Sequence, residues 1–168
     1  MLGALARAPE AIASAVVIGA HPGLTSDEDR RSRVASDAVW IRVLLEEGIE
    51  AFADKWQAQA LFASQSRLPP RVLDAQRRVR IAHDPRSLAL SMESLGLAAM
   101  PSYWDTFASV DVPVDLVVGA LDAKFRALAE KMRARMKKPD LAREIVVDDC
   151  GHNVMLERPA ALAAILAQ

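Results

Sequence analysis

Two polar residues in the C-terminal third of the chain have the side chains needed for proton transfer. Asp122 follows the apolar run 112–119, and His152 follows the apolar run 144–148. A carboxylate hydrogen-bonded to one ring nitrogen holds a histidine in one tautomer and stabilises the imidazolium that forms when the histidine accepts a proton. Each residue alone also has a structural interpretation, because Asp122 could cap the following helix and His152 could be a loop residue. Their placement after two successive apolar runs favours a catalytic pair.

No serine of the chain has the setting of the nucleophile that usually accompanies such a pair. Enzymes with the α/β-hydrolase fold carry the three residues in the order Ser, Asp, His, with the serine in Gly-x-Ser-x-Gly at a turn between a strand and a helix. Ser94 lacks the preceding glycine and falls in a predicted helix, and Cys150 lies on the same predicted loop as His152. We therefore expect the chain to begin just after the serine, with residues 2–8 forming the helix that follows the turn.

The apolar pattern predicts the elements that position Asp122 and His152. Residues 14–19, 112–119 and 144–148 are short runs rich in Val and Ile, which is typical of buried parallel strands. Ligands of open parallel sheets bind beyond the C-terminal ends of the strands, where both residues would lie. The sequence therefore predicts the α/β class: a partial α/β-hydrolase fold with about three parallel strands and flanking helices.

The long segment between the first two predicted strands is helical in pattern. Thr25 with Glu28 three residues later has the form of a capping box. Val34, Ala38, Ile41 and Leu45 then recur at helical spacing and predict the buried face of the first helix.

We therefore predict three segments along the chain. Residues 1–24 form one part of the core sheet, residues 25–108 form a helical cap, and residues 109–168 form the second part of the sheet with the Asp and the His.

Composition excludes several classes of function. The hydrophobic content of 52% is enough for a packed core, and a net charge of −1 argues against nucleic-acid binding. No apolar run approaches the ~20 residues needed to span a bilayer. A single cysteine excludes an internal disulfide and favours a reducing compartment. We expect a cytoplasmic protein, or a plastid protein in a photosynthetic eukaryote, without a membrane partner, a metal or a cofactor.

Several motifs along the chain resemble the 2-succinyl-6-hydroxy-2,4-cyclohexadiene-1-carboxylate (SHCHC) synthases, lyases of menaquinone and phylloquinone biosynthesis that have the α/β-hydrolase fold. The two most specific matches are His-Pro-Gly-Leu at 21–24 and Asp-Ala-Lys-Phe at 122–125. Further matches lie at 28–33, 52–54, 62–64, 101–104, 119–121 and 151–153.

The resemblance implies a reaction. The family removes a proton from a cyclohexene carboxylate that bears an enolpyruvyl group, and pyruvate leaves without an acyl-enzyme intermediate. By the match, Asp122 and His152 are the last two members of a triad whose serine acts as the base. The substrate is a small polycarboxylate.

The resemblance also implies substrate-binding residues in the helical cap. The planar fork of arginine binds a carboxylate at two points, and Arg33 and Arg80 match two substrate arginines of the family. Arg77 or Arg78 are alternatives to Arg80. Trp56 matches an aromatic residue of the same pocket, although its helical spacing alone predicts a core residue.

The chain departs from the family by lacking its earlier strands, its oxyanion-hole loop and its serine. We expect the strand at 14–19 to have an open apolar edge, and the chain alone to be a truncated, inactive form that depends on a complementary N-terminal segment.

Two other functions are open at this point. The first is hydrolysis of an ester or a carbon–carbon bond by another α/β-hydrolase-fold enzyme, which with a neutral substrate would have no use for Arg33 and Arg80. The second is a non-catalytic binding module, to which the missing serine points.

Overall fold

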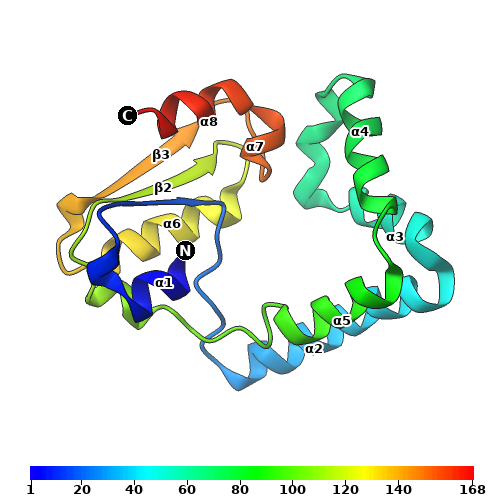
Figure 1. Cartoon of the computed structure of the whole chain (residues 1–168), viewed down its shortest axis with the longest axis horizontal. Coiled ribbons are helices and arrows are strands. Elements are labelled where there is room, and N and C mark those ends of the chain that lie inside the picture. The colour runs from blue at the N-terminus through cyan, green and yellow to red at the C-terminus, as the bar shows by residue number, and fades with distance from the viewer. The chain divides into compact units, whose positions relative to one another are not determined.

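The computed structural model describes residues 1–168, which form two compact units (Figure 1). The sheet unit comprises Met1–Pro22 and Ser102–Gln168, and the helical unit comprises Gly23–Pro101. The predicted cap ran to residue 108, whereas the structure groups the residues after Pro101 with the sheet. The reason is packing, because Phe107 is fully buried in the core of the sheet unit.

The sheet has three parallel strands in the order β1-β2-β3, which confirms the predicted α/β class. The strands are β1 (Ala15–Ile18), β2 (Val114–Gly119) and β3 (Ala142–Val147). Val114 is the partner of both Ala15 and Ala142, so the three strands start level. β2 is central and almost wholly buried, as its run of Val and Leu predicts.

Helices cover both faces of this sheet (Figure 1). The α-helices are α1 (Leu2–Arg7), α6 (Ala123–Arg135), α7 (Val154–Glu157) and α8 (Pro159–Leu166), and three short 3₁₀ segments are Pro9–Ala11, Asp105–Ala108 and Pro139–Leu141. Leu116 and Val118 face a core shared with α1 and α6, whereas Val117 faces a second core shared with α7 and α8. This alternation is the two-residue period of a strand buried on both sides.

The helical unit has a core of its own. It contains α2 (Asp27–Arg42), a π-helical turn (Val43–Glu47), α3 (Gly48–Gln57), a 3₁₀ segment (Ala60–Arg67), α4 (Pro70–Ile81) and α5 (Pro85–Leu95). Its core is built on Val43, Leu44, Phe52 and Ala89. No helix of the chain has both the length and the apolar character needed to cross a bilayer.

The first helix of this unit differs from its prediction in two ways. Ser26, not Thr25, caps α2, with its Oγ accepting the Asp29 N–H at 3.0 Å. Val34, Ala38 and Leu45 of the predicted buried face are exposed, and only Ile41 is partly buried. The π-helical turn places an extra residue in one turn and so shifts the phase, which brings Val43 and Leu44 into the core in place of Leu45.

Candidate active site

Asp122 and His152 lie in contact at the C-terminal ends of β2 and β3. Oδ2 of Asp122 is 2.7 Å from Nδ1 of His152. The Asp122 side chain is 4% exposed and the His152 side chain 23% exposed. Because an ionised carboxylate only accepts hydrogen bonds, Nδ1 carries the proton in this pair. In the neutral imidazole, Nε2 is then the nitrogen that can accept a proton.

The second oxygen of the same carboxylate is part of the fold. Oδ1 of Asp122 accepts the N–H of Phe125 at 3.2 Å and caps α6. The Phe125 ring in turn lies against the His152 ring, with centroids 4.3 Å apart. The helix cap and the histidine partner are therefore one residue, and the two interpretations of Asp122 drawn from the sequence are compatible.

Close approach of two loops brings the pair together. The N–H of Leu121 donates to the carbonyl of Cys150 at 2.9 Å. A Cβ on Gly119 would lie 2.1 Å from the carbonyl oxygen of Gly151, which no real side chain could tolerate. β2 must therefore end in glycine for the loop that carries His152 to pass this close.

The end of β1 also adjoins the histidine. Gly19 has a φ of +50°, a conformation that favours glycine, and a Cβ there would lie 3.4 Å from Cε1 of His152. All three strands of the sheet thus end around one imidazole.

Sequence reasoning missed a second carboxylate beside this pair. Glu157 is 5% exposed, and its two oxygens accept the backbone N–H groups of Gly151 and Asn153. Its position five residues after His152 was the only available signal, and spacing alone does not indicate burial.

The helical unit holds the predicted substrate residues, and among them Arg80 stands apart electrostatically. Arg80 is half-buried, no carboxylate pairs with it, and its burial lowers the pKa of its guanidinium. Its Nη1 donates to Oε1 of Gln57, and its guanidinium lies over the Phe62 ring, 5.6 Å from the centroid. Buried charges are normally paired, so a half-buried cation without an anion is a candidate anion-binding group.

The other arginines differ from Arg80. Arg77 is paired with Asp54 through two nitrogens, which also raises the pKa of Arg77 through the hydrogen bonds. Arg78 is exposed. Nε of Arg33 binds both oxygens of the buried Asp37, at 2.8 and 2.9 Å.

Trp56 is half-buried in an aromatic cluster of the helical unit. Its ring stacks on Phe52 at 5.3 Å and meets Trp40 edge-on at 5.0 Å. It also lies 6.3 Å from Phe62, the ring beneath Arg80. Trp56 therefore packs in the core, as its spacing predicts, and also lies next to the aromatic that supports Arg80.

The glutamine that contacts Arg80 is hydrogen-bonded in turn to a buried glutamine. Because a guanidinium only donates, Gln57 presents Oε1 to Arg80 and Nε2 to Oε1 of Gln65, at 2.9 Å. Gln65 is fully buried. Neither glutamine carried a signal in the sequence, since glutamine is mostly a surface residue.

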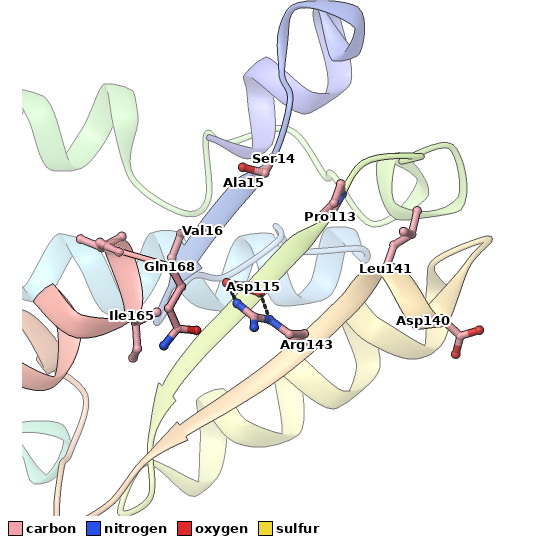
Figure 2. A pocket seen from close by; sticks show the side chains of 11 residues that line it. Ser14, Ala15, Val16, Pro113, Asp115, Asp140, Leu141, Arg143, Ile165 and Gln168 are labelled. Carbon is pink, nitrogen blue, oxygen red and sulfur yellow. Dashed lines mark hydrogen bonds and ion pairs between the residues drawn. The ribbon is translucent and has the colours of Figure 1, made fainter.

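Each unit contains a cavity. One of about 370 Å³ lies where the strands begin, beside the ion pair between Asp115 and Arg143 (Figure 2). Because it is at the opposite strand ends from Asp122 and His152, it is not the site of their chemistry. A smaller one of about 130 Å³ between α3 and α4 is lined by residues that include Arg80 and Gln57.

The sequence of the chain matches a family of known proteins. Residues 2–165 match the model of the alpha/beta hydrolase family. The chain belongs to this family. Within it, the chain is 31% identical over 160 residues to the SHCHC synthase of Enterobacter sp. and 31% identical over 153 residues to that of Klebsiella pneumoniae. These matches cover 95% and 91% of the chain but only 58% and 56% of the two synthases.

Solved structures of other hydrolase-fold proteins share the fold. The structure of MenH from S. aureus matches with a TM-score of 0.91 at 23% identity, covering 99% of this chain and 61% of that one. An enol-lactonase from Burkholderia xenovorans matches with a TM-score of 0.74 at 20% identity, covering 99% and 59%. A thermophilic esterase from Thermogutta terrifontis matches with a TM-score of 0.71 at 20% identity, covering 96% and 56%.

Proposed function

We propose that this chain carries the aspartate and the histidine of the catalytic triad and a substrate-binding part of an SHCHC synthase. The reaction is elimination of pyruvate from an enolpyruvyl cyclohexene carboxylate, with SHCHC as the other product. The observation that carries this proposal is the identity of 31% to synthases across 95% of the chain. The contact between Asp122 and His152 supports it.

In this proposal His152 holds the proton that the serine gives up. A proton leaves a ring carbon, its electron pair forms a new ring double bond, and the bond to the enolpyruvyl oxygen breaks. The leaving enolpyruvate becomes pyruvate by taking up the proton that His152 holds. The base that removes the ring proton is a serine whose own proton passes to Nε2 of His152, and Asp122 stabilises the resulting imidazolium. The 168 residues contain no Gly-x-Ser-x-Gly sequence, so we assign this serine to a segment outside them.

Residues of the helical unit bind the substrate in the same proposal. Arg80 binds one carboxylate, because it is half-buried and no carboxylate pairs with it. Arg33 uses only Nε for Asp37 and so keeps its two terminal nitrogens for a second carboxylate. Trp56 contributes an aromatic surface beside Phe62.

The test is release of pyruvate from the enolpyruvyl substrate. The chain would be assayed alone and combined with the N-terminal segment of the Enterobacter synthase that lies outside the match. We expect release by the combination and none when it carries His152→Ala. If the chain and the segment form a folded complex that releases no pyruvate, the proposed lyase function is rejected.

Ester hydrolysis is the second candidate, because an esterase and an enol-lactonase share the fold. It predicts that the same combination hydrolyses a neutral ester, and that changing Arg33 and Arg80 together to Ala leaves turnover unchanged. The lyase predicts loss of turnover in that double variant.

A further inference from the structure

Glu157 is a buried carboxylate that no side chain neutralises. It ends α7 and is 5% exposed. The other buried carboxylates, Asp37 and Asp122, contact Arg33 and His152. Glu157 instead accepts two backbone N–H groups, that of Gly151 on Oε2 at 2.7 Å and that of Asn153 on Oε1 at 3.2 Å. An ionised carboxylate is costly to bury, so its position here needs a reason.

The two residues that Glu157 binds lie immediately before and after His152. One carboxylate therefore spans the histidine and fixes the peptide on each side of it. The carbonyl of Cys150, one residue earlier, is fixed separately by the N–H of Leu121. Since the backbone on both sides is held, the direction in which the His152 side chain leaves the loop is also set.

We propose that Glu157 is a positioning residue for His152, holding its imidazole at hydrogen-bonding distance from Asp122. The catalytic part of this inference rests on the role of His152 in the proposed function, whereas the contact itself does not. The chemistry requires a carboxylate, because two N–H donors need two acceptor oxygens. A glutamine of the same length offers one oxygen and would turn an NH₂ group toward the other N–H.

The first experiment observes the Nδ1 proton of His152 directly by NMR in the full chain. A proton shared with a carboxylate resonates at low field, and its loss in Asp122→Asn assigns it. We expect the signal to shift or to exchange away in Glu157→Gln. It should remain in the matched variant Glu130→Gln, which changes an exposed glutamate of α6. An unchanged signal in folded Glu157→Gln would overturn the proposal.

A second measurement needs no variant that must fold. In the unmodified chain the amide protons of Gly151 and Asn153 should exchange with solvent far more slowly than that of the neighbouring, exposed Asp149. Equally fast exchange would show that Glu157 does not hold the loop, and the proposal would fall.

The catalytic consequence is measured separately from the proposed function. In the combination that releases pyruvate, Glu157→Gln should lower kcat about 10²-fold with KM unchanged, because a small misplacement of a catalytic group has roughly that effect. An unchanged kcat would overturn the positioning role. If no variant releases pyruvate, the lyase fails, while the NMR signal still decides whether Glu157 positions His152.

Discussion

At the scale of single residues, one carboxylate serves both the fold and the candidate chemistry. Asp122 caps α6 with Oδ1 and contacts His152 with Oδ2. The two functions can be separated experimentally, because an amide can still accept the Phe125 N–H but can no longer hold the histidine as a carboxylate does.

We expect Asp122→Asn to keep most of the stability and to lose turnover. The amide oxygen retains the cap, but the imidazole loses its fixed tautomer, a change that lowers kcat on the order of 10⁴-fold in enzymes with such a pair. Asp122→Ala should additionally lose the cap, about 1 kcal/mol of unfolding free energy. Urea unfolding and pyruvate release measure the two effects. Equal stability of the two variants would contradict the cap, and full turnover of Asp122→Asn would contradict the catalytic pair.

Charge pairing at the residue scale also distinguishes two neighbouring arginines of α4. Arg80 has no anion, whereas Arg77 is paired with Asp54. We expect Arg80→Ala to raise the KM for pyruvate release roughly 10- to 100-fold, since a hydrogen bond to a charged group contributes about 1.5–3 kcal/mol. Arg77→Ala is the matched control and should leave KM unchanged. If Arg77→Ala raises KM more than Arg80→Ala does, Arg77 and not Arg80 binds the carboxylate.

At the scale of elements, the cap of α5 carries an ionisable side chain. α5 begins at Pro85, and the Asp84 side chain accepts the Ser87 N–H at 2.7 Å. The cap bond lowers the pKa of Asp84, and this makes the helix start sensitive to pH.

The sign of that pH effect follows from the direction of the shift. A carboxyl whose pKa is lower in the folded state stabilises the fold above its unfolded pKa of about 3.9 and loses this contribution as the pH falls through its folded pKa. We expect Asp84→Ser, which keeps an uncharged cap, to lose less stability than the unmodified chain between about pH 6 and about pH 3. Urea midpoints at the two pH values measure this. The control is Asp74→Ser, which changes an exposed carboxylate of α4. If the Asp84 variant loses as much stability in acid as the unmodified chain does, the cap does not carry this pH dependence.

At the scale of the whole molecule, β1 forms one edge of the sheet. Ala15 and Gly19 donate their N–H groups to the carbonyls of Pro113 and Val117, at 2.9 Å in each case. Since N–H groups alternate along a strand, those of Val16 and Ile18 point away from β2. Such an edge is a template for pairing with another strand.

We expect the chain alone to associate through this edge. Val16→Pro removes one outward N–H without removing a bond to β2, and it should reduce the associated fraction in light scattering. The control is Val34→Lys, which changes an equally apolar residue that is exposed on α2. A proline at this position would break α2 and so could not serve as the control. If Val34→Lys reduces association and Val16→Pro does not, the chain associates through a surface other than the edge of β1.

The three strands, most helices and the placement of Asp122 and His152 after successive strands could be predicted from the amino-acid sequence. These features follow from periodicity and from residues close in the chain, such as a cap and its helix. Sequence reasoning did not find Glu157 or Gln65, and it could not choose between Arg77 and Arg80. Those features depend on which side chains are buried and which charges meet, and packing between distant segments decides both. Only the tertiary structure therefore identified the carboxylate that spans His152 and showed that Arg80, unlike Arg77, pairs with no anion.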